Sequence, residues 1–285
     1  MFRFGVCTFI WTEEFTEKDA AIIGRAKSLG FEFIDVGIMD PDRFPVKPVK
    51  EKIKEVGVET LGLTPMSVNS ANMIHPDPEV RKNGVKFLKK MVDVCTEIGA
   101  KLISGETFAA GGYLSGKPRT EQEWEWSVKG MREAALYAKE KGDVVICVEP
   151  VTRFETHFLN TAEDSVKYCK EVGTGNVKVN LDSYHMMREE TSFTKAVEAC
   201  GKEYLAHVHV CENNRGILGT GLVPWKEFFT ALKKIDYRGA LTIEAFDPRF
   251  EVLNRITATW RYYTKTGEEL AIQGLRNLKA IEKSL

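Results

Sequence analysis

Four side chains of the kind that bind metal ions stand at the ends of four apolar segments in the second half of the chain. Each follows or closes a run of β-branched and aliphatic residues: Glu149 after Val144–Val148, Asp182 after Val177–Leu181, His209 at the end of Leu205–His209, and Glu244 after Leu241–Ile243. Three carboxylates and one imidazole form an oxygen-rich set that suits a hard divalent cation, so we expect Mn²⁺, with Mg²⁺ or Co²⁺ as alternatives. A lone acid after a strand is more often a helix cap or a loop residue, but four in succession favour one shared metal site.

The apolar segments belong to a regular alternation of strand and helix patterns that runs through the whole chain. The expected strands are Phe2–Cys7, Phe31–Val36, Thr60–Leu63, Lys101–Ser104, Val144–Val148, Val177–Leu181, Tyr204–Val210 and Ala240–Ile243. Between them lie segments with apolar residues at helical spacing, such as Ala20–Leu29, Val80–Ile98, Trp124–Lys141, Ala162–Val172 and Trp225–Ile235. Eight such units without a linker predict an α/β fold, a single (β/α)8 TIM barrel that forms one domain over residues 1–285.

The barrel gives the four side chains a common position. Active sites of these barrels lie at the C-terminal ends of the strands, and the last four strands are neighbours, so their ends meet on one rim. Strand periodicity then places Cys147, Asn180, His207 and Thr242 on the same inward face, one step deeper, and predicts a small polar layer beneath the metal. His207 is an alternative ligand, but His209 is closer to the rim.

Composition excludes several other classes of protein. The 285 residues are 43% hydrophobic, with 40 basic and 41 acidic side chains and a formal net charge of −1, so nothing indicates a polyanionic partner such as nucleic acid. No apolar run approaches the roughly 18 residues that span a membrane. The six cysteines are scattered without a Cys-x-x-Cys pair, and the N-terminus shows no leader pattern. We therefore expect free thiols and a cytoplasmic protein.

Several segments together resemble one known family. Val148–Glu155, Leu181–Met186, His207–Arg215, Ile243–Phe246, Pro76–Arg81 and Trp260–Tyr263 are similar to the ketose 3-epimerases of the xylose-isomerase-like barrel superfamily, the D-tagatose 3-epimerase and D-psicose (allulose) 3-epimerase group. The resemblance covers the whole chain. It implies C3 epimerisation of free ketoses such as D-tagatose, D-psicose, D-fructose or L-ribulose, and a homodimer or homotetramer.

The resemblance also implies roles for individual residues. The metal ligands would be Glu149, Asp182, His209 and Glu244, and Glu149 and Glu244 would also be the catalytic pair. The substrate would be bound at its C1–C3 oxygens by Glu155, His185 and Arg215, between pocket walls that include Trp11, Phe246 and Met66. For each wall residue, ordinary barrel packing is the alternative interpretation.

Chemistry explains why such a site needs two carboxylates. Inversion at C3 requires removal of a proton on one face and its return on the other, with a divalent cation stabilising the cis-enediolate between the two steps. The alternatives are another isomerase of the superfamily, such as a hydroxypyruvate isomerase, or an inosose dehydratase. A non-catalytic sugar- or metal-binding barrel would have no need of opposed proton carriers, and a DNA repair enzyme would need a basic groove.

Two loops depart from the family pattern. Glu106 lies in Ser104–Tyr113, where the family usually has an uncharged Gly-Pro turn, and Thr64–Ala71 is equally distinctive. We expect these loops to shape the part of the pocket that holds C4–C6, so the sequence leaves open both the preferred ketose and the role of Glu106.

Overall fold

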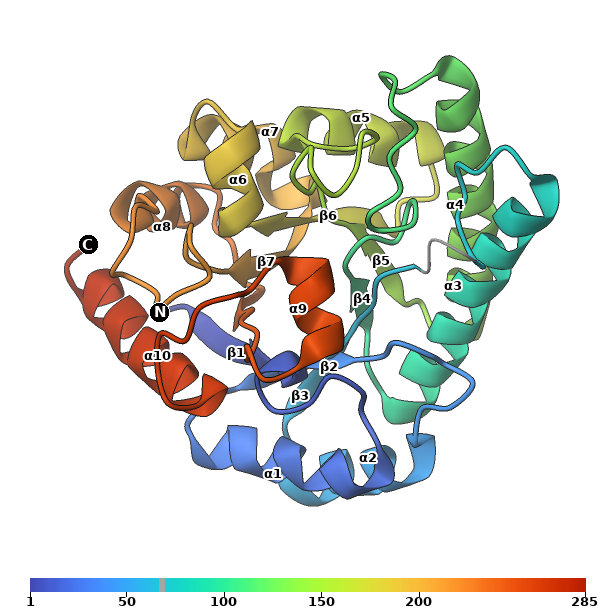
Figure 1. The fold of residues 1–285 in the computed structure, drawn as a ribbon. Helices are drawn as coiled ribbons and strands as arrows, with labels where there is room; N and C mark the ends of the chain where they lie inside the picture. The colour runs from blue at the N-terminus through green and yellow to red at the C-terminus, as the bar shows by residue number, and fades with distance from the viewer. Residues whose placement is uncertain (67–69) are drawn as a thin grey trace.

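The barrel is closed by eight parallel strands that follow one another around the ring in chain order (Figure 1). The computed structural model describes residues 1–66 and 70–285. The strands are β1 (Arg3–Cys7), β2 (Phe33–Gly37), β3 (Glu59–Leu63), β4 (Leu102–Ser104), β5 (Val145–Val148), β6 (Val177–Asp182), β7 (Leu205–Val210) and β8 (Ala240–Ile243). All eight coincide with predicted strands to within two residues at either end. The predicted (β/α)8 barrel is therefore confirmed.

Most helices cover the outside of the ring, and one short helix lies in front of the strands (Figure 1). They are α1 (Ala21–Ser28), α2 (Val46–Val56), α3 (Pro78–Ile98), α4 (Glu121–Lys141), α5 (Ala162–Val172), α6 (Ser183–Glu189), α7 (Phe193–Tyr204), α8 (Trp225–Lys234), α9 (Glu251–Thr257) and α10 (Gly267–Lys283). Local chemistry sets their ends. Thr161 caps α5 by accepting a hydrogen bond from the Asp164 amide, and Gly99 ends α3 with a left-handed φ of 82° that glycine adopts without strain.

The interior of the barrel changes character along its axis. At the N-terminal ends of the strands it is filled by a small apolar cluster of Phe33, Leu61, Leu102, Cys147 and Ala240. Nearer the C-terminal ends of the strands, the inward-facing side chains are polar. The larger apolar core lies between the strands and the surrounding helices. The fold therefore supplies a rigid apolar base and leaves the C-terminal rim for polar side chains.

The six cysteines are free and buried, as the sequence predicts. None of the helices in the described part of the chain combines the length and apolarity needed to cross a lipid bilayer.

Candidate active site

The structure brings the four predicted metal ligands together at the C-terminal rim. Glu149 follows β5, Asp182 ends β6, His209 lies in β7 and Glu244 follows β8. One ligand atom from each lies within 4.8 Å of the others, and all four side chains are buried. The strands position them because inward-facing ends of neighbouring parallel strands meet at one edge.

Asp182 shows most directly that this cluster fits a cation. Its Oδ1 accepts a hydrogen bond from the Tyr184 amide and so caps α6, but its Oδ2 is buried without a hydrogen-bond partner among the described residues. Burial, together with the charges of Glu244 and Glu149, holds the pKa of Asp182 well above its usual value. A divalent cation would supply the missing partner and offset the repulsion between the acids.

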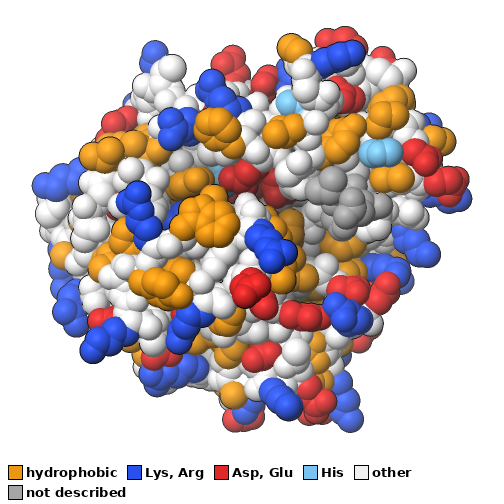
Figure 2. Space-filling view, viewed as in Figure 1, with side chains coloured by type: hydrophobic (Ala, Val, Ile, Leu, Met, Phe, Trp, Pro, Cys, Tyr) orange, Lys and Arg blue, Asp and Glu red, His pale blue; other side chains and the backbone are white. Residues whose placement is uncertain are grey.

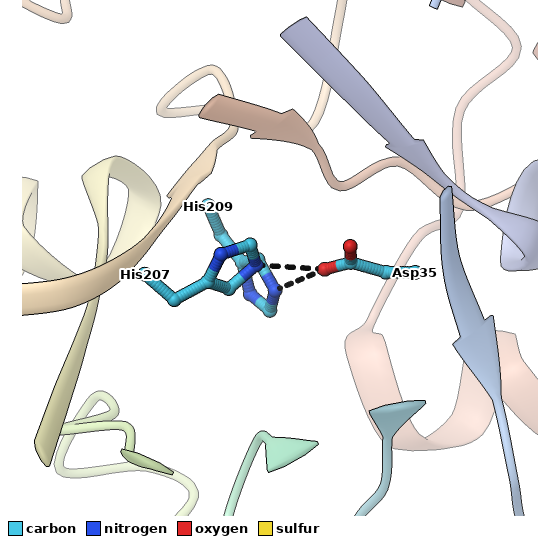
Figure 3. A group of neighbouring side chains, drawn as sticks. All are labelled: Asp35, His207 and His209. Carbon is cyan, nitrogen blue, oxygen red and sulfur yellow. Dashed lines mark hydrogen bonds and ion pairs between the residues drawn. The ribbon is translucent and has the colours of Figure 1, made fainter. Parts of the chain in front are cut away.

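His209 presents one nitrogen to the cluster and the other to the barrel interior. Its Nδ1 lies 3.3 Å from Glu149 Oε1 and 3.5 Å from Glu244 Oε1. Its Nε2 lies 3.2 Å from Oδ2 of Asp35 on β2, and donates its hydrogen there because a carboxylate can only accept (Figure 3). Asp35 thus fixes the tautomer that leaves Nδ1 free to bind a metal.

The predicted polar layer is present beneath the rim, but without Cys147, which packs in the apolar cluster instead because its thiol is the least polar of the four side chains. His207 donates to the same Asp35 oxygen at 2.7 Å, Thr242 donates to the other at 3.1 Å, and the Asn180 amide lies 3.1 Å from His209 Nδ1. Burial alone would raise the pKa of Asp35, but the two imidazoles outweigh it and hold that pKa far below its usual value. Both imidazoles contact Asp35, but His209 also directs its Nδ1 at Glu149 and Glu244, so the geometry favours His209 as the ligand. Asp35 itself was missed by sequence reasoning.

A cavity of about 530 Å³, partly open to solvent, lies above the cluster. Figure 2 shows acidic side chains inside a hollow near the middle of this face, bordered by hydrophobic ones. Its lining includes the predicted catalytic pair, the predicted substrate ligands Glu155, His185 and Arg215, and the predicted wall residue Phe246.

His185 is held as a neutral hydrogen-bond donor. Its Nδ1 accepts the amide N–H of Thr152 at 3.1 Å, so Nε2 carries the proton, 3.9 Å from Glu149 Oε1. Burial and the nearby charge of Arg215 lower the pKa of His185 to about 3. Glu155 lies beside it, with one carboxylate oxygen 3.8 Å from the imidazole and a hydrogen bond from the Thr152 hydroxyl at 3.2 Å.

Arg215 is buried and firmly positioned. Its guanidinium donates to Glu244 Oε2 at 3.1 Å and lies 3.8 Å from the centre of the Tyr184 ring. Its backbone has a positive φ of 60°, which is uncommon for arginine. The preceding Glu212 stabilises this loop, because its carboxylate accepts hydrogen bonds from the amides of Gly219 and Val223 and from the Trp225 indole, at 2.9–3.1 Å.

The walls of the cavity agree with the sequence expectation in part. Phe246 stacks on Phe9 with the ring centres 6.0 Å apart, and both rings line the cavity. Trp11 and Met66 are not among the described lining residues. Trp11 donates its indole N–H to Glu268, and the Met66 backbone bridges to Ala110. Their assignment as walls stays a prediction.

The cavity has a roof that sequence reasoning missed. Leu253, Ile256 and Thr257 of α9 line it, and Figure 1 shows α9 in front of the ring of strands. This helix has only seven residues, so its periodicity gives a weak signal. A helix at this position limits the cavity to a small molecule.

The two distinctive loops also reach the cavity. Glu106 lines it, as do Thr64 and Pro65 from the loop after β3. Ser67, Val68 and Asn69 of that loop lie outside the described residues.

The strand ends of this closed (β/α)8 barrel bring carboxylates, an imidazole and a guanidinium around one roofed cavity. This is the architecture of a barrel enzyme. Comparison with known proteins specifies the class. A family profile described as Xylose isomerase-like TIM barrel matches residues 23–281. The L-ribulose 3-epimerase of Methylomonas sp. (strain DH-1) is 32% identical over 284 residues, 97% of this chain and 96% of that protein.

Two further relatives agree. The D-psicose 3-epimerase of Agrobacterium fabrum is 30% identical and covers 91% of this chain and 90% of its own. The crystal structure of the D-allulose 3-epimerase from Methylomonas sp. in complex with D-allulose superposes with a TM-score of 0.92 at 30% identity, covering 98% of this chain and 96% of that one. The chain belongs to the xylose isomerase-like TIM barrel family and, within it, to the ketose 3-epimerases. It is therefore an isomerase.

Proposed function

We propose that this protein epimerises free ketoses at C3, on substrates of the D-tagatose, D-psicose, D-fructose or L-ribulose type, with Glu149 and Glu244 as the two proton carriers. One observation carries the proposal. The two carboxylates come from β5 and β8, approach the same His209 nitrogen at 3.3 and 3.5 Å, and line one cavity. Inversion of a carbon needs two such groups, because the proton leaves on one face and returns on the other.

We further propose Glu149, Asp182, His209 and Glu244 as ligands of one divalent cation, with Mn²⁺ favoured and Mg²⁺ or Co²⁺ as alternatives. The unpartnered Asp182 Oδ2 and the oxygen-rich donor set support this assignment. When bound, the cation supplies electrostatic stabilisation of the negative charge that develops on the substrate oxygens at C2 and C3.

The side chains around the cavity then have distinct duties. Arg215 fixes Glu244 through its hydrogen bond to Oε2, which leaves Oε1 on the side of the cluster. His185 offers its Nε2–H to a substrate oxygen, and Glu155 accepts a hydroxyl hydrogen beside it. These contacts orient C1–C3 so that the C3 hydrogen faces a carboxylate.

The proton transfer itself belongs to the glutamates. One carboxylate removes the C3 hydrogen as a proton, and the other, on the opposite face, delivers a proton to the same carbon. Each positioned acid or base contributes roughly 10²–10⁴-fold to the rate. The apolar side chains of Leu253 and Ile256 cover part of the cavity and reduce the access of bulk water to the exchanging carbon.

Glu149→Gln and Glu244→Gln test this pair directly. We expect each to lower kcat by at least about 10²-fold on any ketose that the parent protein epimerises. Glu171→Gln on the exposed surface of α5 is the matched control and should leave kcat unchanged. Epimerisation by either site variant at the parental rate would refute the two-carboxylate mechanism.

Incubation in D₂O separates the proposal from its alternatives. Deuterium at C3 together with a C3 epimer supports it. Label at C1 or C2 with an aldose product would identify a sugar isomerase of the hydroxypyruvate isomerase type instead, and loss of water would identify a dehydratase such as one acting on inosose. The absence of any turnover with bound sugar would indicate a binding protein.

We also propose that residues 1–285 form one domain, that the protein is cytoplasmic, and that it assembles as a homodimer or homotetramer. One closed barrel with β1 starting at residue 3 and α10 ending at residue 283 supports the single domain. Six free, buried cysteines fit a reducing compartment. Light scattering on the purified protein would test the assembly.

A further inference from the structure

Glu106 is a buried carboxyl group of the cavity that the proposed reaction does not use. It lies in the loop after β4 and lines the cavity with Glu155, His185 and Arg215, and only 9% of it is exposed. Its Oε1 is buried without a hydrogen-bond partner among residues 1–66 and 70–285. A buried polar atom of this kind costs free energy until something donates to it or accepts from it, and the cavity is where a partner can enter.

The backbone of Gly111 holds this carboxyl group in place. A Cβ atom added at Gly111 would lie 2.1 Å from Glu106 Oε2 and 2.8 Å from its Cδ, so the carboxyl packs directly on the glycine. That segment is itself fixed, because the Gly112 amide donates to the Glu155 carbonyl at 2.8 Å and Ala110 bridges to Met66. Glu106 therefore cannot retreat in this direction.

The charges around Glu106 indicate what it can accept as a partner. Three further carboxyls, Glu149, Glu155 and Glu244, line the same cavity, against one guanidinium and a neutral imidazole. Burial and the charges of these acids raise the pKa of Glu106 well above its usual value, so its carboxyl can both donate and accept. A hydroxyl group of the substrate would complete the missing hydrogen bond.

We propose that Glu106 is a specificity-determining residue that hydrogen-bonds one hydroxyl group of the ketose. The proposal rests on the proposed function, because it requires a ketose in this cavity. Gly111 is the positioning residue that makes the contact possible.

The test compares Glu106→Ala, Glu106→Gln and Gly111→Ala with the parent protein in steady-state assays on D-psicose, D-tagatose and L-ribulose. Glu106→Ala should raise KM about 10-fold while kcat changes much less, because the lost contact binds rather than reacts. The KM of Glu106→Gln should lie between those of the parent and Glu106→Ala, since the amide keeps part of the hydrogen bond.

Gly111→Ala provides a second route to the same site without touching the carboxyl group. Its backbone φ lies outside the left-handed region, so alanine fits the chain and acts only by displacing Glu106. We expect it to raise KM like Glu106→Ala, and the double variant should be no worse than either single one. A melting temperature for each variant confirms that it is folded.

Modified substrates decide the outcome. The substrates compared are the 1-deoxy and 6-deoxy analogues and the ketopentose. On the analogue that lacks the contacted hydroxyl group, the parent protein and Glu106→Ala should have the same KM. An unchanged KM for Glu106→Ala on every ketose would overturn the inference. A parent protein that epimerises no ketose would instead refute the proposed function.

Discussion

Replacing Asp35 by asparagine is expected to weaken metal binding without touching any of the four proposed ligands. Asp35 Oδ2 accepts hydrogen bonds from Nε2 of both His207 and His209, at 2.7 and 3.2 Å, and Oδ1 accepts one from Thr242 at 3.1 Å (Figure 3). Asparagine has one acceptor oxygen where aspartate has two. The amide can keep its oxygen toward the two imidazole N–H groups and turn its NH₂ group to the Thr242 hydroxyl, which then accepts, so the substitution removes the negative charge rather than the contacts.

The size of the effect follows from these contacts. Loss of the negative charge weakens the hydrogen bond from Nε2, so the imidazole of His209 more easily takes the other tautomer, which protonates the nitrogen that faces Glu149 and Glu244. Changes to the outer partner of a metal-binding histidine typically lower affinity about 10- to 100-fold, or about 1.4–2.8 kcal/mol. The protein should also lose about 1–3 kcal/mol of stability, because buried donors lose a charged acceptor.

The assay is competition for Mn²⁺ between the chelator-treated protein and a fluorescent chelator, which measures affinity independently of turnover. Thr242→Val is the matched control, because it removes only the bond to Oδ1 and keeps both imidazole contacts, so its affinity should change less than about 3-fold. A folded Asp35→Asn variant that binds Mn²⁺ as tightly as the parent would refute the role of Asp35 in orienting His209.

Three further outcomes are expected. The pKa of His185 is lowered to about 3 in the folded protein, against about 6.5 in the unfolded chain, so between these values the unfolded state binds one proton more. The stability should therefore fall with decreasing pH by about 1.4 kcal/mol per pH unit below pH 6. Melting curves over this pH range should show a steeper slope for the parent than for His185→Gln, by about this amount. Mn²⁺ at 100 times its Kd should stabilise the chelator-treated parent by about 2.7 kcal/mol, measured by denaturant titration, but not Asp182→Ala. Glu212→Ala should lose about 3 kcal/mol in the same titration, because three donors, two of them buried, lose their acceptor. A variant as stable as the parent would contradict the role assigned to that carboxylate.

The features that could be predicted from the sequence are those that depend on local pattern. The eight strands are short β-branched runs, and a polar side chain at the end of each of the last four marks the rim. Period-2 alternation was enough to place His207 and Thr242 one level below, where they now contact Asp35. Once the fold is a barrel, these inferences need no knowledge of tertiary contacts.

The features that could not be predicted depend on contacts across the barrel. Asp35 is a single acid in the apolar strand β2, and its partner His207 is 172 residues away in the chain. Phe9 belongs to a short turn after β1 and gains its role only by stacking on Phe246. Glu106 was recognised as unusual, but its position depends on the packing of Gly111 against it, which no sequence pattern records.

The four proposed ligands come from β5, β6, β7 and β8, so a bound ion would stabilise this half of the ring directly. The other half would depend on side-chain packing alone. From the first half of the ring, Asp35 on β2 reaches this cluster through its contact with His209. Amide hydrogen exchange should therefore be uneven: removal of the ion should speed exchange in the second half of the chain, while β3 and β4 keep their protection. In that case the ion would govern the order in which the barrel opens as well as its chemistry.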